Sequence, residues 1–235
     1  MIPIIPYERP VKIEFVKGDY IVIKCRTNPA NAYSPTYDIP IPYFRTGTPE
    51  QYLKWLCNAR KACVGQNCVS SAEKFGMFKR LLEGEAKAVF SMEEERGEIT
   101  SDEHFETCVN KLTEHVFPTL AAVTQNRYMK RFMKKPPTAS IREYVARVKE
   151  MNEYFPLYPC ISPTKKEKKI RNHDLKDIIE FGLPGHWKRA MLHQNFNFDR
   201  NNLSKLVEFC ERLNITEPAY WPCSSQGSWK QQPTV

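Results

Sequence analysis

The sequence predicts a mainly α-helical protein built as two small helical lobes, preceded by an extended or short β-hairpin segment. Three observations support this fold class. Apolar residues recur at helical spacing in most segments after residue 43. Four of these segments follow an S/T-x-x-E/Q pattern, which is typical of helix starts. Pro136 and Pro137 stand together between two such segments, and a proline pair cannot continue a helix because neither residue has a backbone N–H.

Residues 1–42 differ from the rest of the chain and form the predicted N-terminal arm. IEFV at 13–16 and YIVIKC at 20–25 are rich in β-forming residues and flank a Lys-Gly-Asp turn, so they predict a short hairpin. Residues 28–42 contain four prolines and predict an extended arm. Two arrangements remain open for this arm: a flexible or partner-swapped segment, or packing on the first lobe of its own chain.

The first lobe is predicted at residues 43–135 and contains four helical segments. Each of the first three starts at a capping box, in which a Ser or Thr hydroxyl and a Glu or Gln side chain satisfy backbone N–H groups of the first turn. A proline opens the fourth. The predicted helices run from Pro49 to about Val64, from the Ser70–Glu73 box with a break at Gly84 before Phe90, from the Thr100–Glu103 box, and from Pro118 to Lys135.

The second lobe is predicted at residues 136–217, after the Pro-Pro linker. Its first helix starts at the Ser140–Glu143 box. An apolar stripe there predicts one buried face and places Arg142, Arg147 and Lys149 on the solvent face. Later helices are expected to end at Gly182, to begin at Pro184, and to extend to about Leu213, and residues 218–235 read as a polar tail. The stripe of the first helix consists of Ile141, Tyr144, Val145, Val148, Met151 and Phe155.

Three segments, taken in order, resemble the Gag capsid region of Ty3/gypsy-type long-terminal-repeat retrotransposons. LLEGEAKAVF at 81–90 resembles the L-x-G-x-A segment of the first capsid lobe, although Val89 stands where a Trp is common. HFETCVNKLTEHVF at 104–117 resembles the helix that follows, and SIREYVARVKEM at 140–151 resembles the start of the second lobe. The resemblance covers residues 43–215. It implies two lobes of retroviral-capsid type and a protein that associates with copies of itself.

The last of these segments is also similar to the major homology region of retroviral capsids. The resemblance implies a buried aromatic at Tyr144 and an arginine at Arg147. The sequence departs from that region at Lys135, Pro136 and Ala139, which replace its Gln-Gly and Glu, so the resemblance does not imply its full hydrogen-bond network. A transposon-type Gag is therefore favoured over a retroviral one. The matching positions are Ser140, Ile141, Glu143, Tyr144 and Arg147.

The formal net charge of +8 favours contact with polyanions, and RNA is the expected partner. The basic residues gather in two groups. A solvated surface that keeps the protein soluble is the alternative interpretation. The first group contains Lys130, Arg131, Lys134 and Lys135, and the second contains Lys165, Lys166, Lys168, Lys169 and Arg171.

Catalytic and cofactor motifs do not occur in the sequence. Nucleophile-elbow, zincin, P-loop and dinucleotide patterns are missing, and so are the Asp-Thr/Ser-Gly protease signature and the nucleocapsid zinc knuckle. The three cysteines between residues 57 and 68 form no C-x-x-C pair, so no metal site is expected. We therefore expect neither an enzyme nor a cofactor. With no export signal or apolar run long enough to span a bilayer, a cytoplasmic protein is expected.

Two functions are compatible with these observations. The first is a structural Gag capsid protein that assembles into virus-like particles around element RNA, with candidate self-association residues Trp187 and Trp55. The second is a monomeric helical module that binds RNA through its basic groups and descends from a host-domesticated Gag. Self-association across concentration and the salt dependence of RNA affinity distinguish them.

Overall fold

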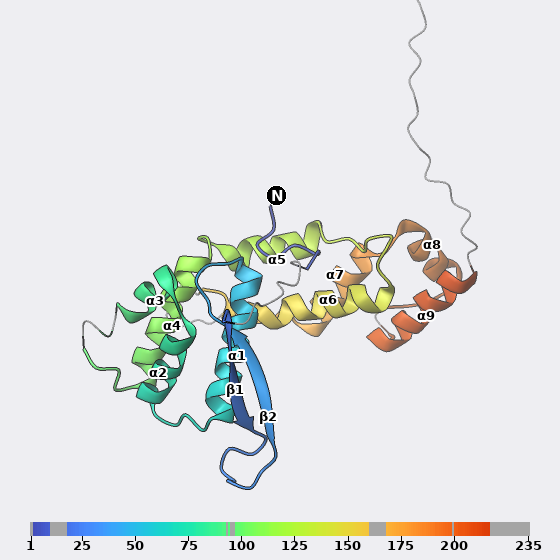
Figure 1. Ribbon diagram of the computed structural model, residues 1–235. Helices are drawn as coiled ribbons and strands as arrows, with labels where there is room; N and C mark the ends of the chain where they lie inside the picture. Colours follow the sequence, from blue (N-terminus) through green and yellow to red (C-terminus); the bar gives the residue numbers. More distant parts are fainter. Residues whose placement is uncertain are drawn as a thin grey trace, which may run out of the picture.

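The computed structural model describes residues 2–9, 18–92, 94, 97–159, 168–198 and 200–216. In these ranges the chain is mainly helical, with nine α-helices and one two-stranded sheet, which confirms the predicted fold class at this level. Figure 1 shows an elongated body, with α1 to α4 gathered at one end, α5 to α7 along the middle, and α8 and α9 at the other end. The sheet projects from the α1 end. No described helix is long and apolar enough to cross a membrane.

The N-terminal hairpin is confirmed, but its strands differ from those expected. β1 (Tyr20–Arg26) pairs antiparallel with β2 (Thr36–Pro42), which lies within the segment predicted as an extended arm. The partner strand expected at 13–16 lies outside the described residues. Pro40 and Pro42 are tolerated in β2 because they occupy positions where the backbone nitrogen faces away from β1, so no ladder hydrogen bond is lost.

The inner face of the hairpin packs on the C-terminal part of α1 (Pro49–Gly65). Ile23, Cys25 and Ile41 are buried there. Gly65 allows the close approach, since a Cβ at this position would lie 2.4 Å from Cys25 Cβ. The turn that ends α1 therefore has room for a glycine alone.

The helices at this end begin close to where the sequence predicts them. α1 is followed by α2 (Ser71–Leu81), α3 (Gly84–Ser91) and α4 (Asp102–Val116). The capping boxes at Thr48 and Ser70 are formed. The break predicted at Gly84 lies at residues 82–83, and Gly84 is the first residue of α3. The box predicted at Thr100 is wrong by one residue, because Ser101 is the N-cap and accepts the His104 N–H. Aromatic rings fill the space between these helices, among them Trp55, Phe78, Phe90 and Phe105.

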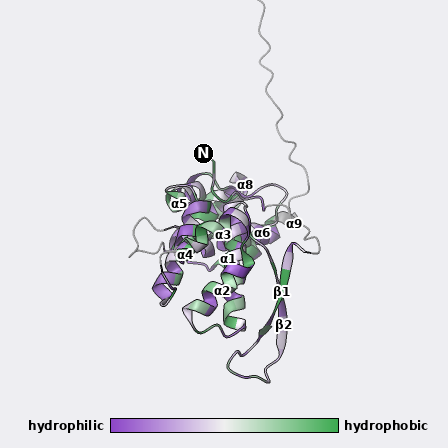
Figure 2. Cartoon of the chain, turned by 60° about the vertical axis from the view of Figure 1, so that its left-hand side comes forward, coloured by the Kyte–Doolittle hydropathy of each residue, from purple (hydrophilic) through white to green (hydrophobic). Residues whose placement is uncertain are grey.

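The second half of the chain adds α5 (Ala121–Arg131), α6 (Ile141–Tyr154), α7 (Asn172–Gly182), α8 (Gly185–His193) and α9 (Leu203–Thr216), with a 3-10 turn at Phe155–Leu157. α5 is shorter than the predicted Pro118–Lys135 helix, because Leu120 adopts a left-handed backbone before it and the helix ends at Arg131. Figure 2 shows hydrophobic and hydrophilic residues on the same helices, as expected for helices that bury one face.

Residues 132–140 connect α5 to α6 and contain the Pro-Pro pair. This connection is anchored to α7, since the Lys135 N–H donates to the Gly182 carbonyl at 2.9 Å. α7 also packs on both α5 and α6. Helices on the two sides of Pro136 are thus in direct contact.

Candidate functional site

The start of α6 is set by local hydrogen bonds. The Ser140 hydroxyl accepts the Glu143 N–H at 3.1 Å, and the Glu143 carboxylate accepts the Ser140 N–H at 2.7 Å. The bond from the Ser140 N–H, followed by a hydrogen bond from the Ser140 side chain, keeps the pKa of the Glu143 carboxyl below its ordinary value. The box therefore starts the helix at Ile141 and determines which side chains face inward.

Arg147 faces inward, and its sequence-based placement on the solvent face of α6 is wrong. Only 2% of the side chain is exposed. The guanidinium forms a bidentate pair with Glu50 of α1, with Nη1–Oε1 and Nη2–Oε2 distances of 2.7 and 2.8 Å. Glu50 is itself 2% exposed. A buried charge pair with this fork geometry satisfies both ions at once, which is why the two charges are tolerated in the interior.

The remaining donors of Arg147 are also used. Nε donates to the Tyr7 carbonyl at 2.9 Å, Nη2 to the Pro6 carbonyl at 2.8 Å, and Nη1 to Glu150 at 2.8 Å. Burial lowers the pKa of Arg147, but the bonds to the two carboxylates outweigh it and raise the pKa above its ordinary value. Arg147 therefore connects α6, α1 and the N-terminal residues with its charge retained.

The pKa of Glu50, the partner of Arg147, is shifted so that its charge is also retained. Burial raises the pKa of this carboxyl, but hydrogen bonds from Arg147 and Lys54 outweigh the burial and hold the pKa below its ordinary value. Lys54 Nζ lies 2.9 Å from Glu50 Oε1 and is 40% exposed. Glu50 thus stays ionised at neutral pH, with Arg147 as its buried partner.

A second polar side chain, Gln125 of α5, binds the N-terminal segment, defined here as residues 2–9. Its amide oxygen accepts the Ile5 N–H at 2.9 Å, and its amide nitrogen donates to the Ile5 carbonyl at 3.0 Å. Gln125 and Ile5 are both fully buried. Figure 1 shows the N-terminal segment running beside α5. Of the two arrangements left open by the sequence, the structure shows packing on the same chain, in contact with α5 and α6.

Tyr144 lies beside this segment and against α7. Its ring stacks on Tyr7 at a centroid distance of 6.1 Å, and the side chain is fully buried. A Cβ on Gly182 would lie 1.8 Å from the Tyr144 hydroxyl oxygen, so this glycine is the space into which the phenol fits. Burial raises the pKa of Tyr144. The hydroxyl has no hydrogen-bond partner among the described residues.

The first basic group lies around the C-terminal end of α7. Lys130, Arg131 and Lys134 are exposed and Lys135 is half-buried. Lys134 Nζ donates to the Phe181 carbonyl at 3.0 Å and lies 3.2 Å from the centre of the Phe181 ring. Lys188 of α8, which the sequence analysis did not single out, donates to the same carbonyl at 2.9 Å. Burial and the Lys188 charge lower the pKa of Lys134.

The second basic group is only partly described. Lys165 and Lys166 lie outside the described residues. Lys168, Lys169 and Arg171 are exposed before α7. Lys169 pairs with Glu153, and Arg171 pairs with Asp174 at 3.4 Å. Two of the described members therefore already have acidic partners.

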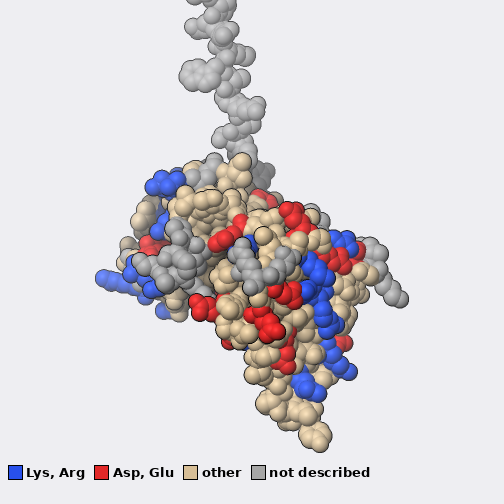
Figure 3. Space-filling view, turned by 90° about the vertical axis from the view of Figure 1, so that its left-hand side faces the viewer, with Lys and Arg blue, Asp and Glu red and all other residues tan. Residues whose placement is uncertain are grey.

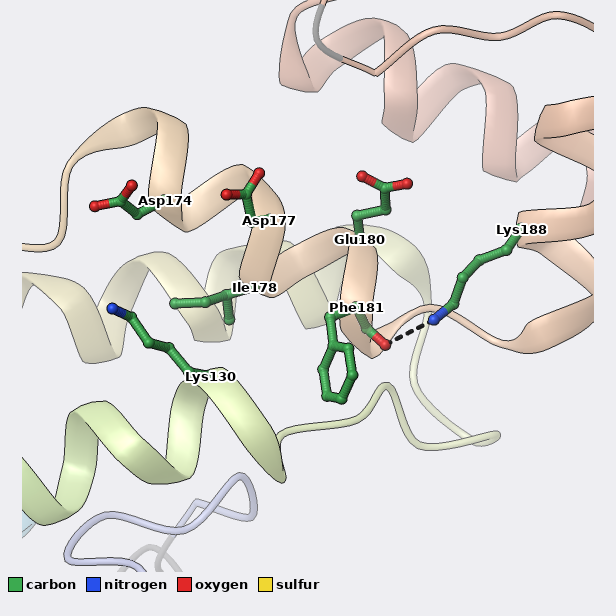
Figure 4. A pocket seen from close by; sticks show the side chains of 7 residues that line it. All are labelled: Lys130, Asp174, Asp177, Ile178, Glu180, Phe181 and Lys188. Atoms are coloured by element: carbon green, nitrogen blue, oxygen red, sulfur yellow. Dashed lines mark hydrogen bonds between the residues drawn. The ribbon is translucent and has the colours of Figure 1, made fainter.

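A cavity of about 640 Å³ is lined by residues of α5, α7 and α8. Figure 4 shows Lys130 extending from α5 toward a row of carboxylates on α7, with Lys188 bonded to Phe181 at the other end. The lining is thus of mixed charge, which is unsuited to a polyanion along its full length. The lining residues are Lys130, Asp174, Asp177, Ile178, Glu180, Phe181 and Lys188.

At one edge of this cavity, His173, Asp174 and Asp177 bring ligand atoms within 4.8 Å of one another. His173 is 75% exposed and lies 3.6 Å from Asp177 Oδ2, one turn along the same helix. This spacing is typical of a solvated i,i+4 pair on a helix surface. The cluster is the only group of potential metal ligands found in the described part of the chain.

Both tryptophans proposed for self-association are buried within the chain. Trp55 is 2% exposed and Trp187 is 4% exposed. Their indoles therefore belong to the interior, and contacts made by α1 or α8 would involve other side chains. Leu192 on α8 and Val64 on α1 are the large exposed apolar residues of these helices, at 78% and 68%.

The surface over the α1 to α4 end is of mixed charge. Figure 3 shows basic and acidic side chains interspersed there, while the tip of the hairpin carries neither. The net positive charge is therefore not gathered into a uniform basic face on this side. Comparison with known proteins adds no assignment, because no family model, curated protein or solved structure matches the chain.

Proposed function

We propose that this chain is a structural Gag capsid protein of the Ty3/gypsy retrotransposon type, or a domesticated descendant, which associates with copies of itself into particles that package RNA. The observation that carries the proposal is the order of three Gag-like segments along the sequence, ending in the segment that contains Tyr144 and Arg147. A mainly helical fold with a small N-terminal hairpin is compatible with it.

The burial of Tyr144 supports the proposal further. The resemblance implies a buried aromatic at this position, and Tyr144 is among the largest fully buried side chains. Arg147, where the resemblance implies an arginine, is buried as well. Ser140 and Glu143 act as a helix cap, and Ile141 is buried at the same helix start. Three of the five matched positions are therefore buried and the other two cap the helix, so we place the assembly contacts on other surfaces.

Assembly of this kind depends on many weak contacts. A contact the size of one helix face is smaller than the roughly 1,200 to 2,000 Å² of a stable protein interface, but contacts repeated around a closed shell add through multivalency. We propose the two ends of the chain as capsid-type lobes, joined by the Pro-Pro connection. The exposed Leu192 of α8 and Val64 of α1 are the candidate contact residues.

Gel filtration and electron microscopy over a range of protein and salt concentrations test this function. We expect large assemblies whose formation increases with protein concentration and with added RNA. Leu192→Asp should reduce assembly while leaving the helical circular dichroism unchanged. Tyr33→Asp is the matched control, since Tyr33 is 96% exposed at the hairpin tip, far from α8 in Figure 1. A wild-type chain that remains monomeric at high concentration, with and without RNA, contradicts assembly.

The alternative function is a monomeric RNA-binding module. It is favoured by the convergence of Lys134 and Lys188 beside Phe181, a residue that is 43% exposed. Lysines next to an exposed aromatic ring are typical of single-strand binding sites. The two lysines also have a simpler role, because both cap the carbonyl end of α7.

RNA affinity measured as a function of salt separates these roles. Phosphate contact predicts about one unit of log–log salt slope per phosphate neutralised. Lys134→Gln with Lys188→Gln reduces that slope if the lysines contact phosphate. Replacing Lys165, Lys166, Lys168 and Lys169 with Gln tests the second basic group in the same assay. An unchanged slope in both variants identifies these lysines as a solubilising surface.

A further inference from the structure

The groove that holds the N-terminal segment has the properties of a peptide-binding site. Its polar contacts go to the backbone of the bound residues: Gln125 binds both backbone groups of Ile5, and Arg147 binds the carbonyls of Pro6 and Tyr7. The two side chains are 0% and 2% exposed. Buried side chains that satisfy a neighbouring backbone in this way replace the ladder of a β-sheet.

Alternate side chains of the segment supply selectivity. Ile5 is fully buried, Tyr7 stacks on Tyr144, and Arg9 pairs with Glu150 at 3.2 Å. The backbone bends at residues 4, 5, 7 and 8, and Ile4 also packs partly against the core. The groove therefore holds the segment in a bent course and contacts an apolar, an aromatic and a basic side chain.

An empty groove would be costly. Without the segment, Gln125 loses both bonds to Ile5, and Arg147 loses two carbonyl acceptors in the interior. A buried polar group without a partner is unfavourable by more than the net value of the bond that it loses. The segment should therefore leave only when an equivalent segment replaces it.

A second copy of the chain carries that equivalent segment. Every contact that the segment makes with its own chain can also be made with an identical second chain. Exchange therefore changes which chain supplies the segment and leaves the hydrogen bonds and packing the same. Ten residues, 10–19, join the segment to β1, which begins at Tyr20. At about 3.3 to 3.6 Å per residue, a fully extended connection of this length spans roughly 35 Å at most. Exchange therefore requires a neighbouring groove within that distance.

We propose that in the assembled protein residues 2–9 of one copy occupy the Gln125–Arg147 groove of a neighbouring copy. This inference rests on the proposed self-association and names a contact that carries it. In a shell the neighbour is held at high effective concentration, which favours the exchanged form over the closed monomer. In the dilute chain the same segment closes on its own groove.

Complementation between two full-length variants tests the exchange. Ile5→Asp has an intact groove and a defective segment, whereas Gln125→Leu has an intact segment and a defective groove. Neither forms the exchanged contact alone. Mixed in equal amounts, they should form a heterodimer visible by native mass spectrometry. The matched control mixes Ile5→Asp with the Ile5→Asp/Gln125→Leu double variant, which supplies no intact segment and should give none.

A labelled peptide of residues 1–9 provides an independent measurement on the Ile5→Asp protein. We expect it to bind, and a peptide carrying Ile5→Asp to bind at least about tenfold more weakly, because the isoleucine side chain is fully buried in the groove. If Ile5→Asp does not fold, Ile5→Ser removes the same apolar contact with less charge burial.

The outcomes distinguish this inference from the proposed function. Particles formed by the wild type, together with no heterodimer and no peptide binding by a folded variant, overturn segment exchange and leave assembly standing. Peptide binding without heterodimers also overturns exchange, and identifies the groove as a site for closure within one chain. Heterodimers in the first mixture and none in the control support the proposal.

Discussion

Replacing Arg147 with Met tests the role of the buried ion pair. The substitution preserves much of the side-chain volume but removes every hydrogen bond to Glu50, Glu150, Pro6 and Tyr7. Glu50, which is 2% exposed, then keeps Lys54 as an ion-pair partner but loses the buried arginine. Breaking a buried pair by removing one partner costs about 3 to 5 kcal/mol. The Pro6 and Tyr7 carbonyls lose their donors as well. We therefore expect the free energy of unfolding, measured by urea denaturation with circular dichroism, to decrease by an amount near the upper end of that range.

The pH dependence of the loss identifies its electrostatic part. In the wild type the pKa of Glu50 lies below its ordinary value, so its favourable contribution is present at neutral pH and lost as the pH falls below about 4.3. In the variant, burial without the arginine raises the Glu50 pKa, so folding becomes less favourable as the pH rises above about 4.3. Both effects increase the difference in unfolding free energy between the wild type and Arg147→Met as the pH rises from 4 to 7.

A double variant, Arg147→Met/Glu50→Leu, completes the cycle. Replacing both ions with apolar residues should recover part of the loss and abolish the pH dependence of the gap. A gap that stays constant between pH 4 and pH 7 would refute the electrostatic reasoning and leave only lost packing. So would a double variant that is less stable than the single one at neutral pH.

Two further substitutions test the local reasoning. Gly182→Ala places a Cβ 1.8 Å from the Tyr144 hydroxyl and should destabilise the fold by about 1 to 3 kcal/mol. Gly76→Ala in α2 is the control, because nothing lies within 4 Å of the added Cβ, and it should be neutral or stabilising. Thermal melts of the two variants compare the same chemical change at a crowded and an open position. Ser140→Ala removes the hydroxyl that caps α6 and should cost about 1 kcal/mol by urea unfolding, with Ser140→Asp restoring most of it, since aspartate also accepts the Glu143 N–H.

Helix starts were predictable because their causes are local. Thr48, Ser70 and Ser140 each bond to a residue three positions ahead, so a four-residue pattern contains the whole interaction. Among the four predicted capping boxes the one error is Thr100 in place of Ser101, where two hydroxyl residues adjoin. Capping boxes thus locate a helix start to within a residue, but they do not say what the helix packs against.

The hairpin partner and the N-terminal groove depend on distant contacts. β1 pairs with a strand containing two prolines, which pattern reasoning counts against a strand until the register is known. Arg147 meets Glu50 across 97 residues and Pro6 across 141. No local window contains these partners. The sequence-based prediction placed Arg147 on the solvent face because arginine is charged, and an unpaired arginine is rarely buried.

Helical position contained a signal that residue type obscured. Arg147 lies three residues after Tyr144 and four before Met151, and Gln125 lies four after Ala121 and four before Met129. All of these neighbours are buried. Residues three or four apart share a helix face, so both polar side chains occupy the apolar stripe. A polar residue within such a stripe is a candidate for a buried bond to a distant partner.

The two polar side chains also couple the N-terminal segment to the arrangement of the helices. Arg147 holds Glu50 of α1 with the same guanidinium that binds the Pro6 and Tyr7 carbonyls. A movement of α1 relative to α6 would break the bidentate pair, whereas exchange of the segment between copies would keep all of these bonds. A rotation of α6 against α1 about the Pro-Pro connection would therefore cost this buried ion pair.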